Sequence, residues 1–334
     1  MPSALILGGT GLLGRAAALR LAAGGWDVVV TGRDPARMPP ELTAAGVVHR
    51  TSERRDADAL AALLGPGADL VVDALCFTAA DARSLVPHLS GVGSAVMFSS
   101  KAVYVDAEGR HINSPERPRF GGPVREDACT LEPAWDGAYQ SREGYGRNKV
   151  AAERVLLESG HPVSVLRASK VHGVGAASPR EWHFVRRVLD GRPVVLLAHG
   201  GRGFDHPTAA VNAAALVEAV AARPGARIVN AADPDVPTGL DIARLVAHTL
   251  GHRWDEVLVE GEEPGRHPWD VVPGIELDLT VAAALGYRPV GGYAQTARAA
   301  VEWAASFGRV PPWADDVVAS DFDYAAEDAY LARA

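Results

Sequence analysis

Cysteine is scarce in this chain, because only Cys76 and Cys129 occur among its 334 residues. Two cysteines cannot build a disulfide framework, and these two lack the paired spacing of a zinc site. The isolated histidines, among them His111, His172 and His206, also lack a metal-ligand spacing. We therefore predict no metal and expect a reducing, cytoplasmic setting.

Basic residues and long apolar runs are also few. Acidic residues outnumber basic ones by 41 to 33, which gives a net charge of -8 and a pI near 5.8. Nucleic acid as the main partner would need an extended basic face. No apolar run approaches the roughly 20 residues that cross a bilayer, and the chain opens on a predicted strand without a basic leader. We expect a soluble protein that binds neither nucleic acid nor membrane.

What the chain has in quantity is apolar sequence, 48% of its residues. In the first half, short apolar runs alternate with helical patterns, and this alternation predicts βαβ units and a parallel sheet. Nearly continuous apolar strands fit a sheet covered on both faces. The sequence therefore predicts an α/β fold with a doubly wound parallel sheet of the Rossmann type. The expected strands are 28–30, 47–48, 70–72, 96–98 and 163–166, and the expected helices include 56–64 and 79–89.

The two halves of the chain differ in regularity. We predict one domain over residues 1–167 and a smaller mixed domain over 168–334, with elements that can return to the main sheet. Residues 105–136 form an interval rich in Pro, Gly, Arg and Glu, longer than a connection requires. We prefer a substrate-covering segment over a tolerated insertion. The helices expected in the second half are 179–189, 208–222, 240–250, 279–285 and 296–305.

A glycine-rich segment follows the first predicted strand. The apolar run 4–7 leads into residues 8–14, Gly-Gly-Thr-Gly-Leu-Leu-Gly, and then into an amphipathic stretch. In a dinucleotide fold, Gly8 allows the tight turn, Gly11 lets the backbone approach a pyrophosphate, and Gly14 lets helix and strand pack closely. The phosphates then lie on the helix N-terminus. The predicted cofactor-binding residues here are Gly8, Thr10, Gly11, Leu12, Leu13 and Gly14. Residues 1–167 are thus the predicted dinucleotide-binding domain, and residues 168–334 the predicted substrate-binding domain.

The end of the second predicted strand bears on coenzyme choice. An acidic residue there would accept hydrogen bonds from the adenosine ribose, but Gly32 takes its place and Arg33 follows. A guanidinium can bind a 2′-phosphate bidentately. We therefore predict that Arg33 binds the cofactor and that NADP is preferred over NAD. The alternative is that Arg33 is a solvated turn residue beside Asp34.

Two further segments carry candidate catalytic residues. Tyr145 and Lys149 are four apart on a predicted helix and share one face, and a nearby ammonium lowers the pKa of a tyrosine toward the working range. Ser100 stands at the carboxyl end of a predicted strand, where ligands bind in open α/β sheets. Ser100 can therefore hold a substrate oxygen while Tyr145 moves the proton. A surface pair of side chains and a strand-ending serine are the alternatives.

These segments together resemble the extended short-chain dehydrogenase/reductase family, also called the NAD-dependent epimerase/dehydratase family. The resemblance runs from Leu5 to about Ala305. It implies that Ser100 is the catalytic Ser/Thr, that Tyr145 is the acid–base, and that Lys149 binds the nicotinamide ribose and tunes the tyrosine. It also implies a homodimer as the expected assembly. The matching motifs are Gly8-x-x-Gly11-x-x-Gly14, Ser99-Ser100-x-x-Val103-Tyr104, Tyr145-x-x-x-Lys149, Pro123–Glu126, Leu166-Arg167 and Val171-x-Gly173.

The chain departs from that family at several positions. Lys170 and His172 stand where members that act on nucleotide sugars usually have Asn and Tyr. Lys101-Ala102 follow Ser100 where 4,6-dehydratases have Asp-Glu, so that elimination is not expected. Lys170 and Arg202 are the candidate substrate residues, because Lys170 can meet a phosphate or carboxylate and Arg202 resembles an arginine that grips a diphosphate. A structural role for Arg202 is the alternative.

The sequence therefore predicts an NAD(P)-dependent oxidoreductase. It would transfer hydride at a hydroxyl or keto carbon of a polar small-molecule substrate, by reduction or by epimerisation. The family resemblance implies a sugar or sugar nucleotide as that substrate. The alternative is a cofactor-binding sensor or scaffold without turnover. Such a protein is expected to lose the Ser/Tyr/Lys set, and all three residues are present.

Overall fold

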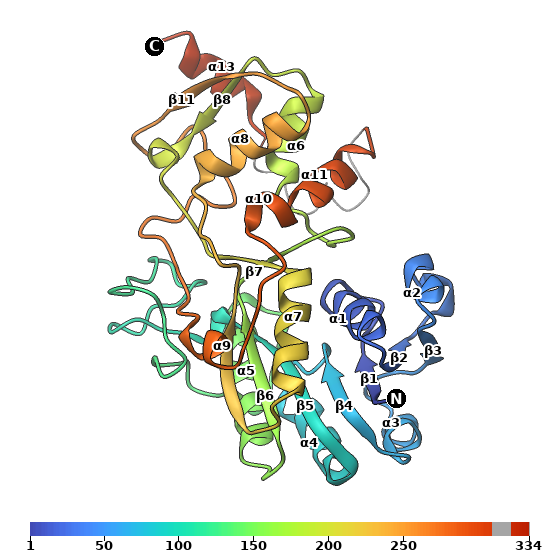
Figure 1. The fold of residues 1–334 in the computed structure, drawn as a ribbon. Helices are drawn as coiled ribbons and strands as arrows, with labels where there is room; N and C mark the ends of the chain where they lie inside the picture. The colour runs from blue at the N-terminus through green and yellow to red at the C-terminus, as the bar shows by residue number, and fades with distance from the viewer. Residues whose placement is uncertain (309–321, 334) are drawn as a thin grey trace. The chain divides into compact units, whose positions relative to one another are not determined.

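The computed structural model describes residues 1–308 and 322–333. They divide into two compact units, each described by itself (Figure 1). The first unit comprises residues 1–169, 210–232 and 277–290, and the second comprises the described residues of 170–209, 233–276 and 291–334. Two segments beyond residue 167 thus belong to the first unit. The dinucleotide-binding and substrate-binding roles of the two halves stay predictions.

A seven-stranded parallel sheet forms the centre of the first unit. Its strand order is β10-β6-β5-β4-β1-β2-β3. Strands β2 and β3 lie on one side of β1 and the later strands on the other, so the strand order reverses between β1 and β4. In open α/β sheets, ligands bind outside the carboxyl ends of the strands at such a reversal. The predicted doubly wound fold is confirmed. The strands are β1 (Ser3–Leu7), β2 (Asp27–Gly32), β3 (Val48–Thr51), β4 (Ala68–Asp73), β5 (Val92–Ser100), β6 (Val163–Ala168) and β10 (Arg227–Ala231).

Helices cover this sheet in two groups. Helix α1 packs on α7, and α4 packs on α5 (Figure 1). Strands β1 and β6 are buried along almost their whole length, as expected for strands covered on both faces. Helix α7 and strand β10 come from the later half of the chain and complete this layer. The helices are α1 (Leu12–Ala23), α2 (Pro40–Ala44), α3 (Ala57–Leu64), α4 (Ala79–Leu85), α5 (Arg142–Leu157), α7 (Ala210–Ala221) and α9 (Thr280–Ala284).

The second unit is smaller and mixed. Two parallel two-stranded sheets, β7–β9 and β8–β11, accompany its helices. Trp182, Phe184, Trp269 and Tyr293 belong to its buried apolar cluster. Its strands are β7 (Lys170–His172), β8 (Val194–Leu197), β9 (Pro207–Ala209) and β11 (Asp255–Leu258), and its helices are α6 (Trp182–Leu189), α8 (Gly239–Thr249), α10 (Tyr293–Thr296), α11 (Arg298–Ala305) and α13 (Tyr324–Leu331).

The long interval 105–136 contains neither helix nor strand, and it lies in the first unit. Single β-bridges attach the interval to its neighbours, between Thr130 and Tyr104 and between Val124 and Leu277. Its substrate-covering role stays a prediction. Among the described helices, none is both long and apolar enough to cross a membrane.

Candidate functional site

The loop between β1 and α1 has little room for side chains at two of its glycines. Gly8 has a φ of +79°, a left-handed conformation that favours glycine. At Gly14, a Cβ atom would lie 2.5 Å from the carbonyl oxygen of Gly8 and 2.8 Å from the Cα atom of Gly9. The first turn of α1 therefore packs directly on the backbone of the loop.

Gly11 has open space around it. It is exposed, and as the N-cap of α1 it makes no side-chain capping hydrogen bond. The nearest atom that a Cβ there would meet is the carbonyl oxygen of Gly8, at 3.4 Å. An uncovered helix N-terminus favours phosphate through its free N–H groups and its dipole. The cofactor-binding role of Gly8, Thr10, Gly11, Leu12, Leu13 and Gly14 stays a prediction.

Gly9 is a structural residue of this loop to which the sequence assigned no role. A Cβ atom there would lie 2.4 Å from Cβ of Val30 on β2. The loop can therefore lie against β2 only with glycine at this position. The signal was present, since Gly9 is the second member of a Gly-Gly pair.

Ser100, Tyr145 and Lys149 come together at the carboxyl end of β5. Ser100 is the last residue of β5, and its side chain forms a hydrogen bond with Tyr145 near the start of α5. Nζ of Lys149 lies 5.9 Å from the Tyr145 ring centroid. The ammonium is buried and donates to the carbonyl oxygens of Cys76 and Phe98, both at 2.8 Å. The three candidate catalytic residues thus occupy one place in the first unit.

The pKa of Tyr145 shifts in the direction opposite to the one predicted. Burial raises it above its ordinary value, and the hydrogen bond with Ser100 lowers it by less. Burial likewise lowers the pKa of Lys149, because a desolvated ammonium is disfavoured. The sequence predicted that Lys149 lowers the tyrosine pKa; in this environment burial has the larger effect on Tyr145.

Helix α5 reaches the end of β5 because of glycines. Ser141 caps the helix by accepting a hydrogen bond from the amide of Gly144 at 2.9 Å. At Gly146, a Cβ atom would lie 2.4 Å from the carbonyl oxygen of Ala102, two residues after Ser100. The glycine inside the Tyr-x-x-x-Lys segment therefore sets the close approach of α5 to the serine. Sequence reasoning did not single out Gly146.

A buried polar network joins α5 to the sheet one turn beyond Lys149. The carboxylate of Glu153 accepts a hydrogen bond from Ser99 and forms an ion pair with Arg167 of β6 at 2.7 Å. The side chains of Glu153 and Arg167 are 3% and 4% exposed. Burial alone would lower the pKa of Arg167, but Glu153 outweighs it and raises that pKa. These contacts hold α5, which carries Lys149, against the end of β5, where Ser99 precedes Ser100.

The same network continues to the interval 105–136. The guanidinium of Arg167 lies 4.7 Å from the Tyr104 ring centroid, and the Tyr104 hydroxyl donates to Asn230 of β10 at 2.6 Å. The backbone N–H of Asn230 in turn donates a hydrogen bond to the carboxylate of Glu126, a residue of that interval, at 2.9 Å. Sequence reasoning missed Glu153 and Asn230 because their partners lie far along the chain.

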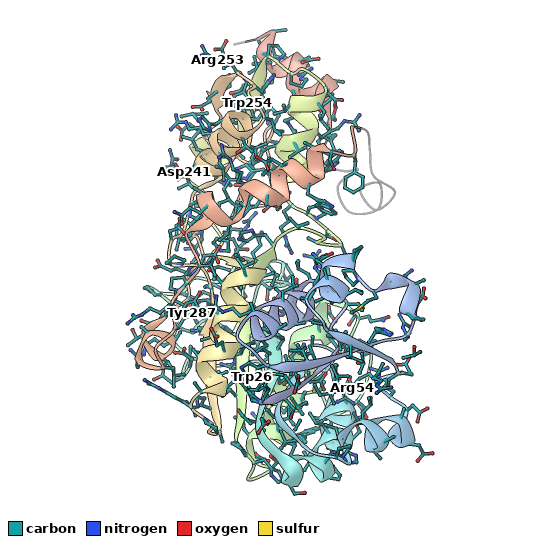
Figure 2. The ribbon with its side chains drawn as sticks, turned by 45° about the vertical axis from the view of Figure 1, so that its right-hand side comes forward. Trp26, Arg54, Asp241, Arg253, Trp254 and Tyr287 are labelled. Atoms are coloured by element: carbon teal, nitrogen blue, oxygen red, sulfur yellow. The ribbon has the colours of Figure 1, made fainter. Side chains whose placement is uncertain are left out.

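Arg54, labelled in Figure 2, is a buried charge at the end of β4. Its Nη2 lies 2.6 Å from Asp73, the last residue of β4, and the two side chains are 4% and 0% exposed. Asp73 also accepts a hydrogen bond from the amide of Leu75 at 2.9 Å. This pair fixes the connection that runs from β4 to the carbonyl group contacted by Lys149. The sequence did not predict it.

The remaining candidate residues have different surroundings. Arg33 is exposed directly after β2 and has no ion-pair partner among residues 1–308 and 322–333. Lys170 and Arg202 belong to the second unit. Lys170 is half-buried with its Nζ 3.1 Å from Asp205, whereas Arg202 is exposed and lies 3.4 Å from Glu260. Each of these two cations already has an acidic neighbour.

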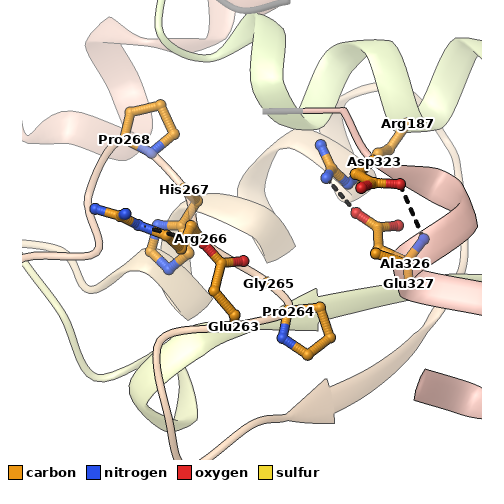
Figure 3. Close-up of a pocket in the computed structure, with 10 residues that line it drawn as sticks. All are labelled: Arg187, Glu263, Pro264, Gly265, Arg266, His267, Pro268, Asp323, Ala326 and Glu327. Carbon is orange, nitrogen blue, oxygen red and sulfur yellow. Dashed lines mark hydrogen bonds and ion pairs between the residues drawn. The ribbon is translucent and has the colours of Figure 1, made fainter. Parts of the chain in front are cut away.

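The second unit contains a polar hollow of about 390 Å³ (Figure 3). An ion pair between Arg187 and Glu327 of α13 lies at one side of it. None of the site residues predicted from the sequence is among its lining residues. Within the described ranges, no group of His, Cys, Asp or Glu side chains is arranged to hold a metal ion. The lining residues are Arg187, Glu263, Pro264, Gly265, Arg266, His267, Pro268, Asp323, Ala326 and Glu327.

Solved structures share this fold over nearly their full length. A UDP-glucose-4-epimerase from Stenotrophomonas maltophila has a TM-score of 0.69 at 20% identity and covers 92% of this chain and 99% of its own. A UDP-glucose 4-epimerase from Thermotoga maritima has 0.67 at 16%, covering 92% and 100%. A UDP-glucuronic acid 4-epimerase from Bacillus cereus has 0.66 at 15%, covering 91% and 99%. At these identities the likeness concerns the fold.

The sequence comparison identifies the family. No curated protein sequence matches the chain significantly. The family described as "NAD dependent epimerase/dehydratase family" matches residues 4–232, which is more than half of the chain. That stretch contains the glycine-rich loop and all three residues that meet at the end of β5. The chain belongs to the NAD-dependent epimerase/dehydratase family.

Proposed function

We propose that the protein transfers hydride between a nicotinamide dinucleotide and a hydroxyl- or keto-bearing carbon of a polar small molecule. The observation that carries this proposal is the meeting of Ser100, Tyr145 and Lys149 beside the end of β5. The nicotinamide ring supplies or accepts the hydride when the coenzyme is bound. Ser100 orients the substrate oxygen, Tyr145 exchanges its proton, and Lys149 holds the ribose hydroxyls.

The glycine-rich loop supports binding of the dinucleotide. Its open position at Gly11 lies at an uncovered helix N-terminus, which suits a pyrophosphate. We propose that the coenzyme is NADP in preference to NAD, because Gly32 replaces the ribose-binding acid and Arg33 is an exposed cation without an ion-pair partner in the described part of the chain. The solved epimerases from Bacillus cereus and Stenotrophomonas maltophila, by contrast, hold NAD.

A sugar nucleotide is the substrate class we propose. The Bacillus cereus relative binds UDP-glucuronic acid and the Thermotoga maritima relative binds UDP-glucose. Lys170 and Arg202 are the cations we propose for its charged groups, in exchange for their present neighbours Asp205 and Glu260. The net reaction is a ketone reduction or an epimerisation through a transient ketone. A homodimer and a cytoplasmic location are further proposals that come from the family and the composition.

The first test identifies the coenzyme and its exchange rate. The purified protein is denatured, the released ligand is identified by mass spectrometry, and NADPH and NADH are titrated by fluorescence. Tightly retained NAD would indicate an epimerase, which must keep its coenzyme between two opposite hydride transfers. Exchangeable NADPH, with turnover on ketones or sugar nucleotides, would indicate a reductase. Failure to bind either dinucleotide would contradict the proposal.

A further inference from the structure

Three elements of the first unit meet at Gly32, the last residue of β2. A Cβ atom on residue 32 would lie 3.1 Å from Oγ1 of Thr10 and 3.1 Å from Nε2 of His49. Thr10 belongs to the glycine-rich loop, and His49 lies on β3, where it pairs with Val30. A hydroxyl group and an imidazole therefore bound the space in which a side chain of residue 32 would begin.

This arrangement disfavours an acid at the end of β2. Contacts of 3.1 Å are shorter than ordinary van der Waals contacts of a Cβ atom, so Thr10 or His49 would have to move. A carboxylate at position 32 would also meet a hydroxyl and an imidazole before it met a ribose, and both can donate hydrogen bonds to it. An acid that accepts hydrogen bonds from a 2′-hydroxyl is therefore disfavoured at the end of β2.

The same corner offers donors to an anion. Nε2 of His49 has no hydrogen-bond partner within residues 1–308 and 322–333, although it is shielded from solvent. A buried ring nitrogen without a partner is unfavourable unless a ligand or a rearrangement supplies one. Arg33, the next residue after Gly32, is exposed. An imidazole and a guanidinium near one strand end are the donor types that suit a phosphate group.

We infer that His49 on β3 is a specificity-determining residue, whose imidazole binds the 2′-phosphate of a phosphorylated dinucleotide beside Thr10, Gly32 and Arg33. The inference rests on the proposed function, since it requires a dinucleotide at the glycine-rich loop. It goes further by assigning coenzyme choice to β3 as well as to the end of β2. Discrimination between the two coenzymes then depends on a pair of strands that lie side by side in the sheet.

The experiment measures the dissociation constants of NADPH and NADH by fluorescence titration of the full chain. Their ratio reports the contribution of the 2′-phosphate alone. We expect His49→Ala to weaken NADPH by about tenfold, the effect of one hydrogen bond to a charged group, and to leave NADH within about twofold. Arg50→Ala is the matched control, because Arg50 is the exposed neighbour of His49 and points to the other face of β3. Its ratio should stay within about twofold of the unmodified protein.

Two more variants keep the test independent of general damage to the fold. His49→Gln retains a hydrogen-bond donor and should keep most of the preference for NADPH over NADH, with an unchanged melting temperature. Gly32→Asp should weaken NADPH without strengthening NADH, because the new carboxylate is engaged by Thr10 and His49. Adding His49→Ala to Gly32→Asp should then strengthen NADH.

The outcomes separate this inference from the proposed function. An unchanged ratio in His49→Ala, or equal weakening of both coenzymes, overturns the inference and leaves the proposed hydride transfer standing. Gly32→Asp alone giving tight NADH binding also overturns it, because the corner would then not exclude an acid. An unmodified protein that binds neither dinucleotide overturns both.

Discussion

Tyr145 is under two opposing influences in this site. Burial raises its pKa and the hydrogen bond with Ser100 lowers it by a smaller amount. The phenol therefore stays protonated near neutral pH. A protonated tyrosine is ready to donate to a substrate oxygen, which is the proton transfer that a carbonyl reduction needs. For the oxidation of an alcohol, the tyrosine must first lose that proton. The buried ammonium of Lys149 is the cation of the catalytic set that would stabilise the resulting phenolate.

Replacing this one hydroxyl tests the proton transfer. We expect Tyr145→Phe to lower turnover by at least about 100-fold, while NADPH binding changes by less than about threefold, because positioned acid–base catalysis is lost and the ring is kept. Turnover is followed by coenzyme absorbance and binding by fluorescence. Tyr139→Phe, the same change on a neighbouring residue that stacks on Phe77, is the control. Near-normal turnover by Tyr145→Phe would contradict the mechanism.

A single methyl group tests the glycine-rich loop. We expect Gly14→Ala to lower the free energy of unfolding by about 1–3 kcal/mol, because its Cβ would lie 2.5 Å from a backbone oxygen that cannot easily move. Gly121→Ala is the matched control, because a Cβ there meets no atom within 4 Å, and its change should stay within about 0.5 kcal/mol. Urea denaturation measures both. Equal free energies of unfolding for the two variants would contradict this, because the loop would then have moved to accommodate the new methyl group.

Helix α4 is held at its N-terminus by one carboxylate. Asp81 accepts hydrogen bonds from the amides of Phe77 and Thr78, at 3.1 and 3.0 Å, and forms a capping box with Thr78. Arg55 donates to the same carboxylate at 2.9 Å. Burial alone would raise the pKa of Asp81, but these bonds outweigh it and lower that pKa. The cap matters for the site because the ring centroid of Phe77 lies 4.4 Å from Nζ of Lys149.

The pH dependence of stability follows from this lowered pKa. The stabilising contribution of Asp81 is complete above the unfolded-state value near pH 4 and is lost as the pH falls through the lower folded-state pKa. We therefore expect Asp81→Asn to cost about 1 kcal/mol of unfolding free energy at pH 7 and progressively less below pH 4. Denaturant titrations of both proteins across this pH range measure the difference. A cost that is constant with pH would contradict the assignment.

Binding of the dinucleotide should be visible in the stability of the protein as a whole. A ligand that binds only the folded state stabilises it by about 2.7 kcal/mol at 100 times its dissociation constant. We expect NADPH at that excess to raise the melting temperature by a few degrees. Nicotinamide mononucleotide, which lacks the adenosine half, is the control and should raise it less. Equal shifts would indicate that the adenosine half adds no binding.

Much of the catalytic set could be predicted because it lies in short segments. The glycines 8–14, Ser100 and the Tyr145–Lys149 pair each follow from local spacing at a strand end or on one helix face. Parallel strands bring their carboxyl ends to one edge of a sheet, so such local signals meet in space. Residues such as Glu153, Asn230 and Arg54 gave no comparable signal, since their partners lie on elements far away in sequence.

The sequence by itself determined the doubly wound sheet, the glycine-rich loop and the family, because apolar periodicity and motif spacing act over short distances. Only the tertiary structure decided how α7 and β10 join the first unit, and how Gly146 brings α5 against the end of β5. It also decided the direction of the Tyr145 pKa shift. The physical reason is that burial and close approach depend on every element packed around a residue, whereas spacing depends only on its neighbours in the chain.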